Sequence, residues 1–172
     1  MRTFRLSRRE DLPQIMAIIA QAQAYLAAQG IDQWQDGYPD EAIVREDIRL
    51  GRGYVLEEDG RVLGIATVDF GGEPTYDIIY DGTWTTKEPY ACIHRVALDA
   101  GTRGTGAADE IMRRAEEIVR GRGVCGIRID THRENVVMQG MLKRNGYAPC
   151  GIIYLDGGKE HGAPRVALDK AL

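Results

Sequence analysis

Apolar residues recur three or four positions apart in four segments of the chain, which is the spacing of amphipathic helices. Seven other segments are short, apolar or alternating, and bounded by turn residues, which is typical of strands. The predicted helices run from Leu12 to a stop at Gly30, through Ile43 and Ile48 to Gly51, from Gly104 to Arg120, and from Glu134 to Arg144. The predicted strands are Thr3 to Leu6, Gly53 to Glu57, Arg61 to Phe70, Tyr90 to Leu98, Cys125 to Asp130, Tyr147 to Leu155, and Arg165 to Leu168.

Turn residues refine this pattern at two places. Asp59-Gly60 separates the second and third strands, and an Asp-Gly pair between apolar runs predicts a β-hairpin. The secondary structure of the segment from Gly71 to Pro89 is not assigned by its sequence pattern. Tyr76 to Tyr80 could extend a strand, whereas Gly82 and Pro89 favour a loop.

The order of elements predicts an α/β (α+β) fold with helices on both faces of one mixed sheet. A right-handed crossover through the helix at 104–120 would make the strands on either side of it parallel. The 172 residues, of which 44% are hydrophobic, suit a single domain over 1–172.

Composition limits the classes of binding partner that the protein is expected to have. The net charge of −4 argues against nucleic acid as the main partner, although one local basic site for a phosphorylated cofactor remains compatible. Cys92, Cys125 and Cys150 are far apart and suit reduced core residues, and no ligand spacing predicts a metal. There is no run of 18 apolar residues and no apolar leader, so we expect a cytoplasmic protein without a membrane partner.

A glycine-rich turn precedes the third helix and carries the strongest chemical signal. Amide N–H groups at a helix start lack intrahelical partners and attract anions. Glycines and small side chains would let a diphosphate approach, and an arginine adds a forked cation. The residues of this turn are Arg103, Gly104, Thr105, Gly106, Ala107 and Ala108. The alternative is a flexible loop before an ordinary helix. Asp109 in place of a third glycine excludes the dinucleotide fingerprint.

The segment from 90 to 147 resembles the GNAT family of N-acetyltransferases. The resemblance rests on Tyr90 to Leu98, Arg103-x-x-Gly106-x-Ala108, Gly126 to Asp130, Asn135, and Asn145-Gly146-Tyr147. It implies a mostly antiparallel seven-stranded sheet whose fourth and fifth strands splay apart to admit acetyl-CoA as cosubstrate. The turn at Arg103 would bind the pyrophosphate. The amides of Val96 and Leu98 would align the pantetheine and polarise the thioester carbonyl, and Asn135 would contact the pantetheine arm, unless it is a helix cap.

The implied reaction is transfer of acetyl from acetyl-CoA to a primary amine by direct attack in a ternary complex. His94 is the expected base, since a pKa near 6.5 suits proton removal; the alternative is a histidine that only hydrogen-bonds at the sheet edge. Many family members carry a tyrosine acid at the position aligned with Leu142. Tyr147 and Tyr154 could replace it only if they face the thioester; otherwise they are packing residues. The missing acid motivates an alternative function, a non-catalytic acyl-CoA sensor or interaction module.

The loop between the first two helices is the expected acceptor site. Trp34 and Tyr38 could receive an ammonium group over their rings, and Asp32 or Asp36 could offset its charge. Trp34 could instead pack as a lid. Tyr76, Tyr80 and Trp84 are a further possible wall. The acceptor would be a small-molecule or peptide amine, with a small cationic amine favoured, and the protein a monomer or homodimer.

Overall fold

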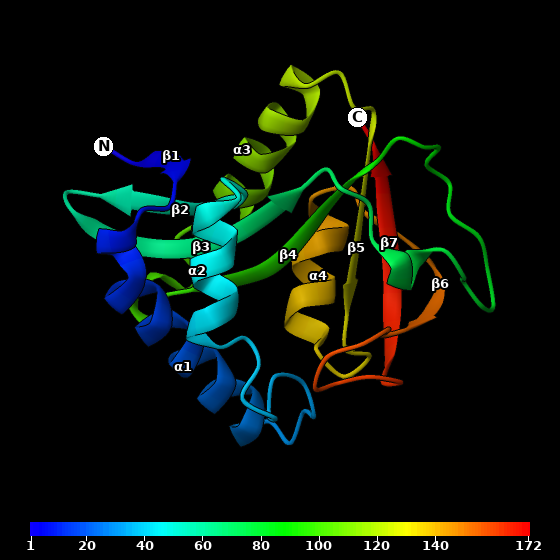
Figure 1. Ribbon diagram of the computed structural model, residues 1–172, viewed down its shortest axis with the longest axis horizontal. Helices are drawn as coiled ribbons and strands as arrows, with labels where there is room; N and C mark the ends of the chain where they lie inside the picture. The colour runs from blue at the N-terminus through cyan, green and yellow to red at the C-terminus, as the bar shows by residue number, and fades with distance from the viewer.

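One mixed sheet organises the chain, in the strand order β1-β2-β3-β4-β5-β7-β6 (Figure 1). The computed structural model describes residues 1–172. The strands are β1 (Thr3–Leu6), β2 (Gly53–Glu58), β3 (Arg61–Asp69), β4 (Ala91–Leu98), β5 (Gly126–Thr131), β6 (Ala148–Tyr154) and β7 (Pro164–Ala171). The helices are α1 (Leu12–Ala28), α2 (Glu41–Arg49), α3 (Ala107–Gly121) and α4 (Val136–Arg144).

All neighbouring strands are antiparallel except β4 and β5, which are parallel. The predicted mixed, mostly antiparallel sheet of seven strands is therefore confirmed. The hairpin predicted at Asp59-Gly60 is also present, and both of its central residues have positive φ, 51° and 80°. Such angles give a turn whose twist matches that of the flanking strands.

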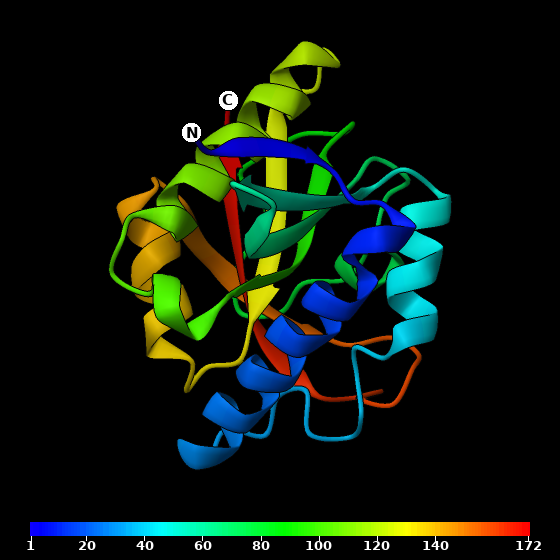
Figure 2. The same ribbon diagram turned by 90° about the vertical axis from the view of Figure 1, so that its left-hand side faces the viewer.

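Helices cover both faces of the sheet, as predicted. Figure 2 shows α1 and α2 on one side of the strands and α3 and α4 on the other. Ile15, Ile18 and Ile19 of α1 pack with Val44 of α2 against apolar side chains of β2, β3 and β4. On the other face the apolar stripes of α3 and α4 meet side chains of the central strands, including Met112, Ala115, Leu142, Ile127 and Ile129. No helix is both long and apolar enough to cross a membrane.

Several element boundaries differ from the sequence prediction, and three of the differences have a clear physical reason. α3 begins at Ala107 rather than Gly104, because Gly104 and Gly106 adopt left-handed backbone angles, with φ of 76° and 79°. α4 begins at Val136, two residues later than predicted, because Asn135 caps it. β7 continues through Asp169 and Lys170, beyond the predicted end at Leu168, because these polar residues find partners inside the fold.

The segment between β3 and β4 that the sequence left open is a loop with one short 3-10 turn at Pro74–Tyr76. Trp84 Nε1 donates to the Tyr76 carbonyl at 2.9 Å, and Tyr76 is almost fully buried. A single bridge joins Tyr80 to Ile152 of β6. The loop therefore packs as a fixed cover over the β5 and β7 side of the sheet.

The sheet opens between its two parallel strands. β4 and β5 pair only at Ala91 with Ile127 and at Cys92 with Arg128, after which β4 runs diagonally away from β5 (Figure 1). A register shift in the β3–β4 ladder coincides with Arg95, whose φ is 52°. The splay implied by the family resemblance is therefore present, and it leaves one edge of β4 without a neighbouring strand.

Candidate functional site

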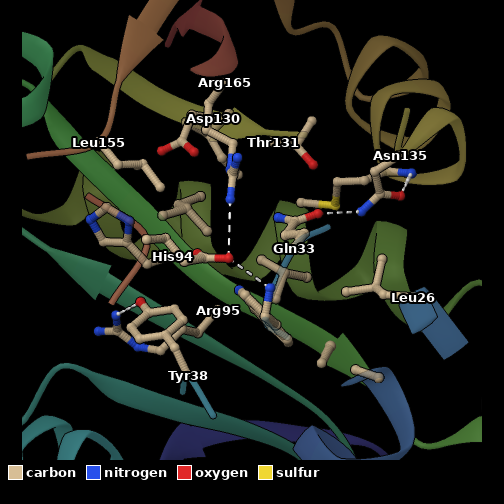
Figure 3. A pocket seen from close by; sticks show the side chains of 18 of the residues that line it. Leu26, Gln33, Tyr38, His94, Arg95, Asp130, Thr131, Asn135, Leu155 and Arg165 are labelled. Carbon is tan, nitrogen blue, oxygen red and sulfur yellow. Dashed lines mark hydrogen bonds and ion pairs between the residues drawn. The ribbon is translucent and has the colours of Figure 1, made fainter. Parts of the chain in front are cut away.

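A cavity of about 630 Å³ lies where β4 and β5 diverge. This volume is within the range of small-molecule sites in proteins, roughly 300–1,000 Å³. Figure 3 shows part of its wall, to which α1, β4, β5, β7 and the cap of α4 all contribute side chains. Among the residues predicted from the sequence, those that line it are Trp34, Tyr38, His94, Val96, Leu98, Arg103, Gly104, Ala108 and Asn135.

The glycine-rich turn forms an uncapped helix N-terminus at one end of this cavity. No side chain accepts from the first amides of α3, and a Cβ added at Gly104 or Gly106 would meet no atom within 4 Å. The Arg103 guanidinium lies 4.0 Å from the centre of the Tyr25 ring, at the cavity wall. Thr105, Gly106 and Ala107 belong to the same turn but do not line the cavity. Bare amides, positive macrodipole and a neighbouring guanidinium fit a diphosphate group.

The acidic residues of the first turn of α3 do not oppose this fit. Asp109 accepts from Arg144 at 3.0 Å and from Asn145 at 2.7 Å. Glu110 lies 3.4 Å from Arg2. Their negative charges are thus offset by partners outside the turn.

Asn135 serves as a cap and also faces the cavity. Its Oδ1 accepts from the Met138 amide at 3.2 Å, and its Nδ2 donates to Gln33 Oε1 at 3.1 Å (Figure 3). The two sequence interpretations of this residue, helix cap and cofactor contact, are therefore compatible. Gln33 joins the start of α4 to the loop after α1, a contact that no local pattern predicts.

His94 lies on the cavity wall, as expected, but its chemistry differs from the expectation. Its side chain is 18% exposed, and its Nε2 lies 3.7 Å from Glu73 Oε2. Burial, with the Arg95 charge as a second cause, lowers the pKa of His94 to about 4. The assumption of a pKa near 6.5 is therefore corrected, and the imidazole is neutral at pH 7.

Asp130 is a titratable cavity residue that the sequence reasoning missed. It lines the cavity from the end of β5, and the Tyr76 hydroxyl donates to its Oδ2 at 2.7 Å. Burial raises the pKa of Asp130 to about 6, while the hydrogen bond from Tyr76 opposes that rise. The available signal was a carboxylate at the end of an otherwise buried strand. Tyr76 itself does not line the cavity, nor do Tyr80 and Trp84.

The acceptor loop is only partly placed as expected. Trp34 and Tyr38 line the cavity with their ring centres 6.4 Å apart, whereas Asp32 and Asp36 are exposed and lie outside its wall. Tyr38 is fixed by Arg95, which donates to its hydroxyl at 2.8 Å (Figure 3). The carboxylates that do reach the cavity come from other loops and strands: Asp69, Glu73, Asp130, Asp156 and Glu160.

The tyrosines considered as acids lie elsewhere. Tyr147 is buried in the core with the pKa of its hydroxyl raised by burial, and Tyr154 is exposed against Tyr80, ring centres 5.3 Å apart. Both are packing residues. Leu142 is fully buried in the same core as Tyr147. The tyrosines at the cavity are Tyr25 and Tyr38. No group of three or more His, Cys, Asp or Glu side chains is gathered as for a metal ion.

Comparisons with known proteins agree with this architecture. Residues 18–147 match the acetyltransferase (GNAT) family. The GNAT acetyltransferase of Streptococcus agalactiae is 36% identical to this chain, with a TM-score of 0.87 over 99% of this chain and 95% of the other. Two further structures share the fold: the GNAT acetyltransferase of Listeria monocytogenes at 20% identity (TM-score 0.73, covering 99% and 95%) and the ribosomal-protein-alanine N-acetyltransferase of Brucella melitensis at 19% (TM-score 0.70, covering 99% and 99%). A comparison with curated proteins found no match. The matched family segment and the close structural relative show that this chain belongs to the GNAT acetyltransferase family.

Proposed function

We propose that the protein transfers the acetyl group of acetyl-CoA to a primary amine by direct attack within a ternary complex. One observation carries the proposal: a single cavity holds both the uncapped α3 N-terminus with Arg103 and the acid–base side chains His94 and Asp130. The edge of β4 that lost its partner strand lies between these groups.

The turn from Arg103 to Ala108 would hold the pyrophosphate of acetyl-CoA through backbone amides and the guanidinium. Val96 and Leu98 on β4 would align the pantetheine arm, with Asn135 facing them from α4. A backbone amide beside the thioester carbonyl stabilises the negative charge that develops on its oxygen during attack. These roles use residues that line the cavity or belong to the same turn.

The amine must lose a proton before or during attack. A free alkylamine with a pKa near 10.4 is neutral in only about one part in a thousand at pH 7. We assign the first proton transfer to Asp130, whose pKa of about 6 lies closest to neutral pH. His94 is neutral there and can accept a hydrogen bond from the amine, then its proton once attack has made the nitrogen more acidic. Glu73, 3.7 Å from His94, would stabilise the resulting imidazolium.

Direct attack is favoured over an acyl-enzyme because no cysteine is suited to act as the nucleophile. Cys92 and Cys150 are buried, and burial raises the pKa of both thiols. Cys125 is exposed but does not line the cavity. The leaving CoA thiolate needs only modest help at neutral pH, so the lack of a tyrosine at position 142 does not prevent turnover. Three unpaired cysteines also suit a reducing compartment, so we place the reaction in the cytoplasm.

The mechanism is tested by initial rates with both substrates varied, together with the intact mass of the enzyme after incubation with acetyl-CoA alone. A ternary complex gives intersecting double-reciprocal lines and an unmodified enzyme mass. Parallel lines with one covalently bound acetyl group would contradict direct attack.

A further inference from the structure

A buried arginine on the cavity wall has a terminal nitrogen that makes an ion pair but no well-aligned hydrogen bond. Arg165 is 3% exposed and stands at the start of β7, next to Asp130 of β5 (Figure 3). Its Nη1 donates to the Pro164 carbonyl at 2.9 Å, but its Nη2 donates to no acceptor. Burying a guanidinium nitrogen without a well-aligned acceptor is costly, which makes this donor a candidate to bind a ligand group.

The nearest charge to this nitrogen is Glu160, on the loop between β6 and β7. Its Oε1 lies 3.2 Å from Arg165 Nη2 without a well-aligned N–H, and the same oxygen accepts the Trp34 amide at 2.8 Å. Gly157, Gly158 and Gly162, all at positive φ, flank Glu160 in this loop. The Arg165 guanidinium, as an ion-pair partner, and the Trp34 amide, as a hydrogen-bond donor, thus meet one carboxylate oxygen that a glycine-rich loop supplies.

This pair of donors is part of the catalytic cavity. Arg165, Glu160 and Trp34 line it together with His94 and Asp130. Thr131, paired with Val166 in the β5–β7 ladder, contributes a second buried polar atom without a partner, its Oγ1. This wall therefore offers an arginine and a hydroxyl close to the carboxylate of Asp130, which can attract an ammonium group.

We propose that the acceptor amine also carries a carboxylate, as an amino acid does, and that Arg165 and the Trp34 amide bind this carboxylate in place of Glu160. The inference rests on the proposed function and names the substrate class of the same site. Exchange of one carboxylate for another leaves the buried guanidinium neutralised, while Glu160 moves into water where its charge is well solvated. An arginine fork also matches a carboxylate geometrically, which gives selectivity for it.

The test is a binding measurement on the whole protein saturated with CoA. Standard amino acids are titrated beside their own carboxamides and decarboxylated amines, which differ only at the carboxylate. We expect at least one amino acid to bind about tenfold or more tightly than both of its matched analogues. Equal affinity within every matched set, or tighter binding of the decarboxylated amines, would overturn the inference.

Two variants locate the selectivity. Glu160→Gln removes the competing charge and should strengthen binding of that amino acid several-fold. Asp36→Asn, at an exposed carboxylate outside the cavity wall on the loop that carries Trp34, should change it little. Arg165→Gln should abolish the preference for the carboxylate while CoA affinity is retained. If Glu160→Gln leaves amino-acid binding unchanged or weaker, Glu160 has only the structural role of linking its loop to Trp34 and Arg165, and the inference fails.

Binding is measured without turnover, so the two proposals can fail separately. Acetyl transfer to amines with no selectivity for a carboxylate would overturn the inference and leave the acetyltransferase function intact. Carboxylate-selective binding without acetyl transfer to any amine would support the inference about the ligand and contradict the acetyltransferase function.

Discussion

The Tyr76 hydroxyl donates a 2.7 Å hydrogen bond to Asp130 Oδ2, which ties the loop before β4 to the end of β5 that lines the cavity. Burial disfavours the charged carboxylate and raises the pKa of Asp130 above the usual range of a carboxyl group. The Tyr76 hydrogen bond favours the charged form, as does the charge of Arg165, whereas Glu73 and Glu160 oppose it. Together these effects leave the pKa of Asp130 at about 6. Tyr76 is therefore a positioning residue that sets the protonation of its neighbour.

This pair predicts the pH dependence of the reaction. A base acts in its deprotonated form, so kcat/KM should fall as the pH drops through about 6. Tyr76→Phe removes the interaction that favours the carboxylate, which should move this acidic limb to higher pH. Asp130→Asn should remove the limb and lower kcat/KM by about 10² or more. A Tyr76→Phe profile with an unshifted limb would show that another group titrates.

The His94 imidazole should not titrate in the same pH range. Its pKa of about 4 predicts that the imidazole ring shows no titration between pH 8 and pH 5.5 when its ring protons are followed by NMR. His94→Gln, which assigns the signal, should lower kcat with little change in CoA affinity and with the acidic limb of Asp130 retained. A His94 signal that titrates near pH 6.5 would restore the simpler histidine-base mechanism.

The glycine turn predicts a sharp loss of cosubstrate binding. Gly106→Glu places bulk and negative charge where the pyrophosphate would lie, so CoA affinity measured by calorimetry should be lost. Gly123→Glu is the matched control, because Gly123 also has a positive φ, 72°, with no atom within 4 Å of an added Cβ, but follows the other end of α3. Both variants carry the same strain and charge. Equal CoA affinity in the two folded variants would contradict pyrophosphate binding by the turn from Arg103 to Ala108.

The backbone distortion in β4 depends on a buried ion pair. Arg95, at φ 52°, donates to both carboxylate oxygens of Asp47 at 2.8 and 2.9 Å, and Asp47 is 4% exposed. Asp47→Ala leaves the guanidinium uncompensated, so the free energy of unfolding in urea should fall by about 3–5 kcal/mol. Glu41→Ala breaks the exposed pair with Arg45 and should cost about 0.5 kcal/mol or less. Similar losses in the two variants would mean that Asp47 does not hold the distortion.

Local patterns predicted the elements and one half of the site. The turn from Arg103 to Ala108 could be predicted as an anion site because a helix N-terminus with glycines has a sequence signature. The strands and helices follow from the spacing of apolar residues. His94 was found as the titratable side chain in a strand beside that turn. The lowered pKa of His94 could not be predicted from the sequence, because burial and the charge of Arg95 depend on the folded environment.

The other half of the site depends on contacts between distant segments. Arg165 meets Glu160 and the Trp34 amide, and Asp130 meets Tyr76, across separations that no local pattern encodes. Asp32 and Asp36 were predicted at the acceptor site because acidic and aromatic residues alternate in their loop. The loop instead turns both carboxylates to solvent and presents Trp34 and Tyr38 to the cavity.

The most direct test of the account measures CoA thiol release from acetyl-CoA with and without a broad panel of primary amines, with the acetylated amine identified by mass spectrometry. We expect thiol release that depends on the amine, equals the amount of acetylated amine formed, and is lost in Gly106→Glu. A protein that binds CoA tightly, yet releases no more thiol with any amine than without, would be an acyl-CoA-binding module and would contradict the account.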